Sequence, residues 1–349
     1  MRPGGGAALP YHLTVVTIAF LGPHGTFTEE ALRTQADLDR EDLLPLASVP
    51  DVIAAIEQGE ADLGVVPIEN SIEGSVTVTL DTLGFETDLL IQREIDIPIS
   101  LALCAHGGTH LGAITRVVAH PMAAAECRLW LAEHMPGVEV RASNSNAEAV
   151  LNVARSQKKG LAAIGTVHAA EIYGLPVIAK EIEDHPENQT RFVLVGRGIP
   201  APTGHDKTTI VCFQRADRPG SLLAILQEFA ARSINLVKLE SRPTKRNLGD
   251  YCFFIDCEGH ISDELVADAL RNLVAKQADV KFLGSYPVGG PDEVTRARRK
   301  AAGRAWRDAE QWLDDLRGQV RADTAAPEGR RGGAASAPRV SRGAAEPGG

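Results

Sequence analysis

The chain has 349 residues, more than a single ordinary core accommodates, and a prior of roughly 150 residues per domain predicts about two domains. Its composition, 44% hydrophobic and 23% charged, is that of a folded globular protein, which excludes a wholly disordered or fibrous chain. The net charge of −10 argues against a general nucleic-acid-binding protein.

The acidic charge is concentrated before residue 291, because residues 291–349 hold 12 basic and 9 acidic side chains. Five scattered cysteines, with no CxxC pair and no zinc-finger spacing, predict reduced thiols in a cytoplasmic protein and no metal site. The best membrane candidate, residues 13–21, is far shorter than the ~20 residues that span a bilayer, so no membrane association is expected. The Gly-rich residues 1–14 are expected to be a disordered extension.

Short β-branched runs alternate with amphipathic helical runs over the first two thirds of the chain, which is typical of a mainly parallel sheet covered by helices. The pattern first predicts strands at residues 15–22 and 63–67, with helices at 27–36, 52–58 and 75–83. Thr26 is the expected N-cap of the first helix. Glu29, three residues later, has the spacing of a capping box.

A second α/β unit follows. We expect helices at 123–134, 146–157 and 167–173, the last closed by Gly174, and strands at 94–104, 116–119, 138–142, 161–164 and 177–182. A last strand is predicted at 192–196. The chain is thus expected to form lobe one from residues 15–83 and 185–198 and lobe two from residues 84–184. Because the chain would pass between the lobes twice, we expect a cleft between them, and such clefts bind small ligands.

A Pro/Gly linker at residues 199–206 leads to a compact unit at 207–287. Its predicted order is strand 207–214, helix 221–232, strands 234–239 and 251–256, helix 263–276 and strand 280–284. This βαββαβ order is ferredoxin-like. Residues 288–349 contain a charged segment to Leu316 that can form a helix, then an Ala/Gly/Arg/Pro-rich tail that is expected to be disordered.

Three polar segments follow the ends of predicted strands: GPHGTF at residues 22–27, VVPIENSIEGS at 65–75 and DHPENQTRF at 184–192. The first is a glycine turn before a capped helix, whose free N–H groups can face an anion. Glu69, Asn70 and Ser71 project from the second, while Thr190 and Arg191 lie where the third enters a strand. Each alone fits equally well a connecting turn, a helix cap or a surface ion pair.

Taken together and in this order, the segments resemble those of prephenate dehydratases, which show a GPxGTF start, a PIENSxxG loop and a TRF triplet. ESRP at residues 240–243 resembles the signature of the family's C-terminal ACT domain, and the resemblance runs from about Thr17 to Pro287. It implies an α/β fold. A two-lobed periplasmic-binding-protein-like catalytic domain with a central cleft would cover 15–198, and a ferredoxin-like ACT regulatory domain would cover 207–287.

The resemblance also implies the chemistry. Members of the family convert prephenate, a dicarboxylate, to phenylpyruvate, water and carbon dioxide in L-phenylalanine biosynthesis, and they need no metal or redox cofactor. The family's essential threonine corresponds to Thr190, which would assist the leaving hydroxyl. Arg191 would hold a substrate carboxylate through its guanidinium, and Asn70 and Ser71 would hydrogen-bond the substrate. Thr26 and Gly25 would close the anion site from the first lobe.

Some residues near these motifs receive structural interpretations. Glu126 stands where many relatives carry glutamine, and because a carboxylate beside a dianion is unfavourable, we interpret it as a solvated or ion-paired helix residue. His24 and His185 are interpreted as structural, and SNSN at residues 143–146 chiefly as a helix cap.

The ACT resemblance implies feedback regulation, because family members bind phenylalanine between two such domains. The implied effector contacts are Pro219, Gly220, Ser221, Leu222, Asn235, Glu240, Ser241, Arg242 and Pro243, and the implied assembly is a homodimer or homotetramer. GSLL at residues 220–223 stands where relatives often have GALV, which leaves the effector preference open. Two alternatives remain: an arogenate dehydratase, acting on the amino analogue of prephenate, and a non-catalytic two-lobed amino-acid sensor, against which Thr190 and Arg191 argue.

Overall fold

The computed structural model describes residues 16–156, 158–214, 219–245, 250–288, 308–309 and 311–319. The expectations of disorder for residues 1–14 and for the tail beyond residue 319 lie outside the described residues. The chain forms two compact units, residues 1–304 and 305–349. In the second, residues 308–309 and 311–317 are helical, within the segment expected to form a helix.

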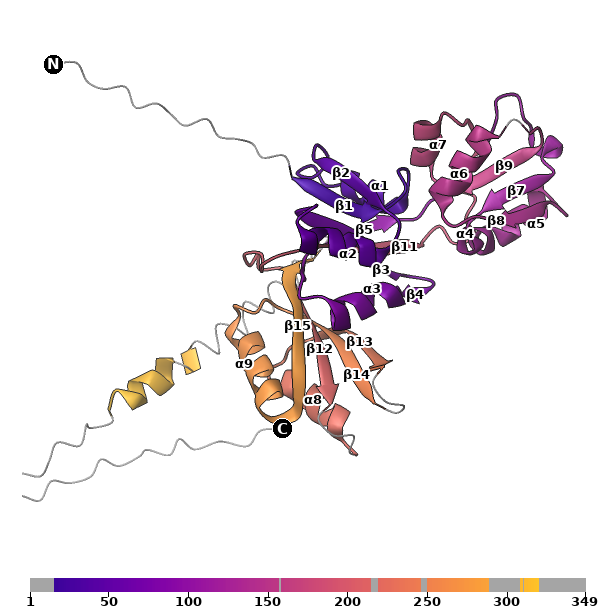
Figure 1. The fold of residues 1–349 in the computed structure, drawn as a ribbon. Helices are drawn as coiled ribbons and strands as arrows, with labels where there is room; N and C mark the ends of the chain where they lie inside the picture. Colours follow the sequence, from indigo (N-terminus) through magenta and orange to yellow (C-terminus); the bar gives the residue numbers. More distant parts are fainter. Residues whose placement is uncertain are drawn as a thin grey trace, which may run out of the picture. The chain divides into compact units, whose positions relative to one another are not determined.

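The first lobe is built on a six-stranded mixed sheet in the order β2-β1-β3-β11-β5, with β4 beside β3. The strands are β1 (Thr17–Leu21), β2 (Asp42–Leu46), β3 (Leu63–Asn70), β4 (Gly74–Ser75), β5 (Leu90–Pro98) and β11 (Gln189–Gly196). β1 runs parallel to β2 and β3, whereas β11 is antiparallel to both β3 and β5. The chain therefore returns from the second lobe to add an interior strand, β11, between β3 and the edge strand β5 of the first sheet (Figure 1).

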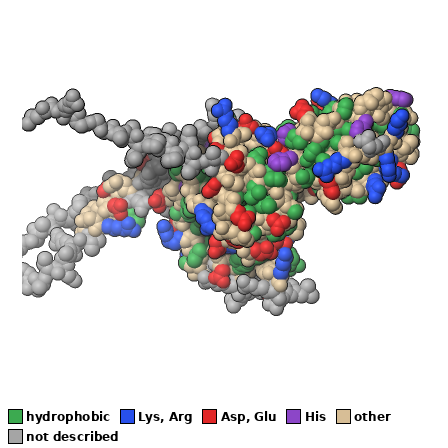
Figure 2. All heavy atoms as spheres, turned by 45° about the horizontal axis from the view of Figure 1, so that its top comes forward, with side chains coloured by type: hydrophobic (Ala, Val, Ile, Leu, Met, Phe, Trp, Pro, Cys, Tyr) green, Lys and Arg blue, Asp and Glu red, His purple; other side chains and the backbone are tan. Residues whose placement is uncertain are grey.

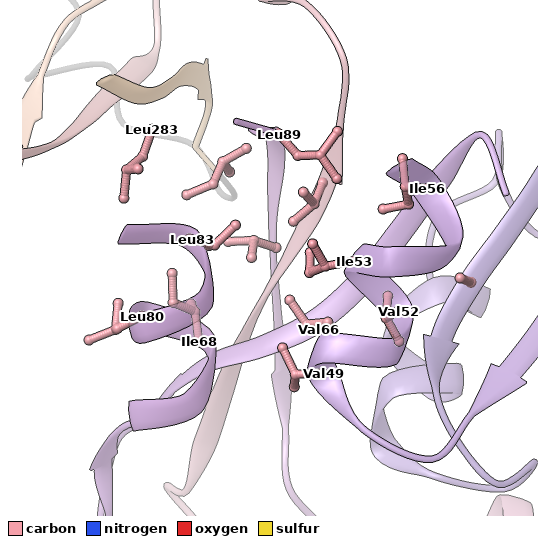
Figure 3. Close-up of a cluster of buried hydrophobic side chains, with 14 of the residues drawn as sticks. Val49, Val52, Ile53, Ile56, Val66, Ile68, Leu80, Leu83, Leu89 and Leu283 are labelled. Carbon is pink, nitrogen blue, oxygen red and sulfur yellow. The ribbon is translucent and has the colours of Figure 1, made fainter. Parts of the chain in front are cut away.

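Three short helices accompany this sheet: α1 (Phe27–Arg33), α2 (Val49–Gln58) and α3 (Thr77–Asp81), the last continuing into the π-helical turn η1 (Thr82–Glu86). Thr26 caps α1 as predicted, since its side chain accepts a hydrogen bond from the Glu29 N–H at 3.4 Å. The reciprocal half of the capping box differs, because the Glu29 carboxylate accepts from the Gly25 N–H at 2.7 Å instead. The apolar side of α2 packs on β3 around Val66 (Figure 3).

The second lobe contains a five-stranded mixed sheet in the order β10-β6-β9-β7-β8. Its strands are β6 (Ala102–Ala105), β7 (Arg116–Ala119), β8 (Glu139–Ala142), β9 (Leu161–Gly165) and β10 (Val177–Ala179). Its helices are the 3₁₀ turn η2 (Leu111–Ala113), α4 (Pro121–Glu126), α5 (Arg128–His134), α6 (Asn146–Arg155) and α7 (Val167–Tyr173). β7 is parallel to β8 and β9, and β6 is antiparallel to both of its neighbours.

Four sequence-based expectations about these elements are wrong. The strand expected at 94–104 is two strands in different sheets, β5 and β6, because Pro98 lacks the N–H that would continue the ladder. β2 was missed because it contains Pro45, which an edge strand tolerates. The helix expected at 123–134 breaks at Cys127, whose backbone is not helical. β11 begins at Gln189 rather than at residue 192, because strands on both sides pair with its polar start.

The third sheet has the order β13-β14-β12-β15. Its elements are β12 (Asp206–Gln214), α8 (Ser221–Ala230), β13 (Leu236–Pro243), β14 (Tyr251–Glu258), α9 (Glu264–Asn272), the π-helical turn η3 (Leu273–Gln277) and β15 (Ala278–Pro287). This confirms the predicted βαββαβ order. One face of the sheet packs under its helices around Phe229 and Ile255, and the other face joins the first-lobe core through Phe254, Leu283 and Tyr286. Figure 3 shows Leu283 beside this core. The predicted α/β fold class is confirmed.

Candidate functional site

Thr190 lies on β11, an interior strand of the first sheet, opposite Asn70 of β3 and Ile97 of β5. Its side chain is almost buried, with 9% of the residue exposed. The Thr190 Oγ1 accepts a hydrogen bond from the Asn70 Nδ2 at 2.9 Å. Since the oxygen accepts from Asn70, the hydroxyl hydrogen is directed elsewhere and remains able to donate.

The Asn70 side chain is fully engaged. Its Nδ2 also donates to the Asn188 Oδ1 at 2.8 Å, and its Oδ1 accepts from the N–H groups of Ile72 and Glu73, both at 2.9 Å. These bonds fix which end of the amide faces Thr190. Asn70 is therefore better suited to orienting the Thr190 hydroxyl than to donating to a ligand.

Asn188, which is not among the residues predicted from the sequence, connects the members of this network. The residue is 1% exposed, and its Oδ1 also accepts from the Ser71 Oγ at 3.2 Å. The Ser71 Oγ in turn accepts from the Gln189 N–H at 3.0 Å. The spacing of Asn188 and Thr190 could have predicted that the two side chains lie together, because residues two apart at the start of a strand point to the same side. We call Asn70, Ser71, Asn188 and Thr190 the amide–hydroxyl cluster.

Glu126, the last residue of α4 in the second lobe, reaches the amide–hydroxyl cluster. The Asn188 Nδ2 donates to its Oε1 at 3.1 Å. Burial raises the pKa of the Glu126 carboxyl above its ordinary value, and the nearby Glu73 and Glu183 act in the same direction. The expectation that Glu126 is a solvated or ion-paired helix residue is wrong, because its partner is a buried amide.

Arg191 lies on the opposite face of the sheet from Thr190, as the alternation of side chains along a strand requires. Its Nη1 donates to the Glu69 Oε2 at 2.8 Å, and its Nε lies 3.2 Å from Glu94 and 3.4 Å from Asp96. Burial acts against the charged guanidinium, but these carboxylates raise the pKa of Arg191 overall. The Arg191 guanidinium, predicted to hold a substrate carboxylate, is thus occupied by carboxylates of the protein.

The charges around Arg191 continue into the third sheet. The Lys207 Nζ of β12 lies 2.6 Å from the Glu94 carboxylate, and the Lys238 Nζ of β13 lies 3.5 Å from Glu69 and donates to the Ser75 Oγ at 2.7 Å. We call this set the interdomain charge cluster: Glu69, Glu94, Asp96, Arg191, Lys207 and Lys238. It joins the strands that carry Asn70 and Thr190 to the C-terminal domain.

The glycine turn before α1 is used for packing between the lobes. Gly25 has φ +87°, and a Cβ there would lie 2.7 Å from the Ala169 Cα of α7. Its N–H donates to Glu29, and its carbonyl accepts from the Thr166 Oγ1 at 2.8 Å. Thr26 donates to the Leu21 carbonyl at 3.0 Å. The groups for which an anion was expected at Gly25 and Thr26 therefore have partners within the protein.

The other titratable groups give little support to metal or thiol chemistry. Across the described residues, no three His, Cys, Asp or Glu side chains are grouped so that they could hold a metal ion. Each of the five cysteines is buried, and burial raises the pKa of the Cys104 thiol to about 12. A thiol with so high a pKa is a poor nucleophile at neutral pH. No described helix has the length and apolar character needed to cross a membrane.

The C-terminal domain contains a cavity of about 490 Å³ beside the start of α8. Its lining is Gln214, Gly220, Ser221, Leu222, Leu223, Leu226, Ser241, Tyr251 and Phe253. Four predicted effector contacts are among these residues: Gly220, Ser221, Leu222 and Ser241. Pro219 and Pro243 are not in the lining.

Three other predicted effector residues point elsewhere. Glu240 accepts a hydrogen bond from the Ser75 Oγ, and the Arg242 Nη2 donates to the Asp81 Oδ1 at 2.7 Å, so both face the first lobe. The Asn235 Nδ2 donates to the Glu258 Oε1 at 2.9 Å. Along β13, Ser241 thus points into the cavity while its two neighbours contact the first lobe.

Comparison with known proteins connects both regions to one family. The family model for prephenate dehydratase matches residues 18–199, and the model for the ACT domain matches residues 208–275. The chain belongs to the prephenate dehydratase family. This confirms the resemblance carried by the three motifs and the ESRP segment.

The similarity to individual prephenate dehydratases extends over most of the chain. The prephenate dehydratase of Mycolicibacterium vanbaalenii is 42% identical over 315 residues, covering 86% of this chain and 98% of the relative. A solved prephenate dehydratase from Arthrobacter aurescens, in complex with L-Phe, is 40% identical with a TM-score of 0.78, covering 87% and 100%. The prephenate dehydratase from Staphylococcus aureus is 28% identical with a TM-score of 0.67, covering 77% and 99%.

Proposed function

We propose that this chain converts prephenate to phenylpyruvate, carbon dioxide and water, with Thr190 assisting the departure of the ring hydroxyl. The observation that carries the proposal is the nearly buried Thr190 hydroxyl, whose oxygen accepts from Asn70 at 2.9 Å so that its hydrogen is available to a ligand. The family match over residues 18–199 supplies the reaction.

The reaction determines what the site must do. The bond between the ring and its hydroxyl breaks with both electrons leaving on oxygen, and the bond to the ring carboxylate breaks with its electrons completing the aromatic ring. The dianionic substrate therefore yields carbon dioxide, the phenylpyruvate anion and hydroxide, which takes up one proton to become water. A donor aimed at the leaving oxygen stabilises the charge that develops there. Thr190 donates a hydrogen bond or relays a proton, and as a weak acid it is not the proton's final source.

The neighbouring residues receive separate roles. Asn70 and Asn188 orient the Thr190 hydroxyl, and Ser71 fixes Asn188. Arg191, committed to three protein carboxylates, links the two domains instead of holding the substrate carboxylate. On the face shown in Figure 2, acidic and basic side chains are interspersed, so a dianion must be recognised by local groups and not by one broad basic field.

The cavity in the C-terminal domain is the proposed site for L-phenylalanine, the ligand in the Arthrobacter aurescens complex. Leu222, Leu226 and Phe253 offer an apolar surface for an aromatic ring. Gly220 is the N-cap of the ten-residue helix α8, and the N-terminal end of a helix favours a carboxylate.

Effector binding would reach the catalytic domain along β13. Ser241 lines the cavity, and the adjacent Glu240 and Arg242 contact Ser75 and Asp81, which follow the strand that carries Asn70. A shift of β13 on effector binding therefore changes contacts close to the amide–hydroxyl cluster. By linkage, if effector binding weakens substrate binding by some factor, substrate binding must weaken effector binding by that same factor.

The assembly and the domain limits are part of the proposal. β13 is an edge strand of its sheet, and Val237 and Leu239 on it are large, exposed apolar residues, which supports pairing of two ACT domains in a homodimer or homotetramer. We propose a catalytic domain at residues 15–198, a linker at 199–206 and an ACT domain at 207–287. The first crossing between lobes then lies near residue 100, not residue 83, because β5 belongs to the first sheet. We expect a cytoplasmic enzyme.

The test is turnover of prephenate by the purified full chain, with phenylpyruvate measured by its ultraviolet absorbance in alkali and the enzyme-free rate subtracted. We expect turnover of prephenate, and we expect added L-phenylalanine to lower its rate. No turnover by well-folded protein, with or without L-phenylalanine, would overturn the proposal, and effector binding without turnover would indicate an amino-acid sensor. A higher kcat/KM on arogenate than on prephenate would indicate an arogenate dehydratase.

A further inference from the structure

Glu126 is the point at which the second lobe contacts the amide–hydroxyl cluster. Its Oε1 accepts from the Nδ2 of Asn188, which is 1% exposed, so water cannot readily replace the carboxyl group in this bond. The main chain is also held, because the Asp184 N–H donates to the Glu126 carbonyl at 2.6 Å. The end of α4 and the segment returning to the first lobe therefore form one connected structure around Asn188.

The charges that face Glu126 are mostly negative. Glu73 approaches from the loop after β3, while Glu183, Asp184 and His185 lie on the segment before β11. The Asp184 carboxylate is occupied, since it accepts from the N–H groups of Leu129 and Trp130 at 2.9 and 3.1 Å. Along the chain on either side of Glu126, His120 precedes α4 and Arg128 is the first residue of α5. Within the part of the chain that the structure describes, Glu126 forms no ion pair with a lysine or arginine.

Burial and the acidic neighbours therefore favour the neutral carboxyl group at Glu126. Burial is the main cause of the raised pKa of Glu126, and repulsion from Glu73 and Glu183 adds to it, against the opposite effects of the Asn188 hydrogen bond and of His185. A dianionic ligand beside the cluster would add to this repulsion. The neutral carboxyl group still accepts from Asn188 through its carbonyl oxygen, so the hydrogen-bond network does not require ionisation.

We propose that Glu126 is a positioning residue of the dehydratase site, which accepts from Asn188 in either protonation state and repels the dianionic substrate when it is ionised. The inference rests on the proposed function. Neutral Glu126 favours binding of the dianion, so kcat/KM should fall as the pH rises through the pKa of this residue. The fall appears in KM, because the charge opposes substrate binding.

Glu126→Gln tests the inference, because the amide keeps the carbonyl that accepts from Asn188 and has no charge. We expect KM for prephenate to rise with pH in the wild-type enzyme and to stay level in Glu126→Gln. Glu133→Gln, which removes the same charge from an exposed position of α5, is the matched control and should follow the wild type. A KM that rises equally with pH in wild type and Glu126→Gln would overturn the inference.

Glu126→Ala tests the positioning role separately, because it removes the partner of Asn188 as well as the charge. We expect kcat to fall about tenfold or more at every pH in this variant while Glu126→Gln stays within about threefold, as for a lost positioning contact. A wild-type kcat in folded Glu126→Ala would overturn the positioning role. If the wild type itself turns over no prephenate, the proposed function has failed. An active wild type with unchanged variants contradicts the Glu126 inference alone.

Discussion

The two faces of β11 carry different chemistry. On the Thr190 face, all four members of the amide–hydroxyl cluster are neutral and hydrogen-bonded at 2.8–3.2 Å. On the Arg191 face, carboxylates of the first lobe contact the Arg191 guanidinium of the same lobe and lysines of the C-terminal domain. A neutral network holds a hydroxyl in one geometry over a wide pH range, whereas a charged one responds to salt and to displacement of either domain. One strand thus combines a fixed reaction geometry with a connection between domains.

The largest effect is expected from Thr190→Ala on the neutral face. Loss of the donor to the leaving oxygen should lower kcat by about 10²–10⁴-fold. Thr190→Ser, which keeps a hydroxyl, should retain a substantial part of the activity, and circular dichroism and L-phenylalanine binding should be unchanged in both. Full activity of Thr190→Ala would show that this role is wrong.

Asn188→Ala should have the next largest effect. It leaves the donor groups of Asn70 and Ser71 and the Glu126 carboxyl without their buried partner, at about 1–3 kcal/mol of stability. The misaligned Thr190 should lower kcat by about tenfold to a hundredfold. Steady-state kinetics and thermal melts measure the two effects. In a double-mutant cycle with Glu126→Ala the losses should not add, and simple additivity would contradict a direct connection.

Arg191→Gln tests the charged face. Glu69, Glu94 and Asp96 lose their shared cation, which should lower the free energy of unfolding by about 2–3 kcal/mol, between the values for exposed and buried ion pairs. KM for prephenate should change less than about threefold, because the guanidinium is not at the substrate. Chemical denaturation and initial rates provide both numbers. A rise in KM of about a hundredfold without loss of stability would restore the substrate-binding role expected from the sequence.

The smallest effect on catalysis is expected from Glu240→Ala at the far end of the charged face. Glu240 contacts Ser75 rather than the cavity, so inhibition by L-phenylalanine should weaken about tenfold while uninhibited turnover is kept. Ser241→Trp, which fills the cavity, should instead abolish effector binding measured by calorimetry. If both variants lose effector binding equally, Glu240 is a contact residue and not part of the connection between domains.

How much of a residue's role can be predicted from the sequence differs even between neighbouring residues. The order of the motifs along the chain was enough to predict Thr190 and Asn70 as site residues. Their contact, however, joins residues 120 positions apart and depends on the antiparallel pairing of β11 with β3, which local sequence patterns do not encode. Arg191 was placed with Thr190 because the strand was expected to start at residue 192. Once the strand begins at Gln189, alternation sends the two side chains to opposite faces. Glu126 was misinterpreted for the related reason that its partner is 62 positions away.

The return of β11 to an interior position of the first sheet also bears on the order of folding. β3 and β5 precede the second lobe in the chain, yet each pairs with β11, so the first sheet lacks the strand that joins them until residue 196 has been made. The second lobe, whose strands and helices lie within residues 102–179, contains all of its own sheet and can form before the first is complete. The strand that completes the first sheet is also the strand that brings Thr190, so the chain acquires its reactive hydroxyl in the same step in which that sheet closes.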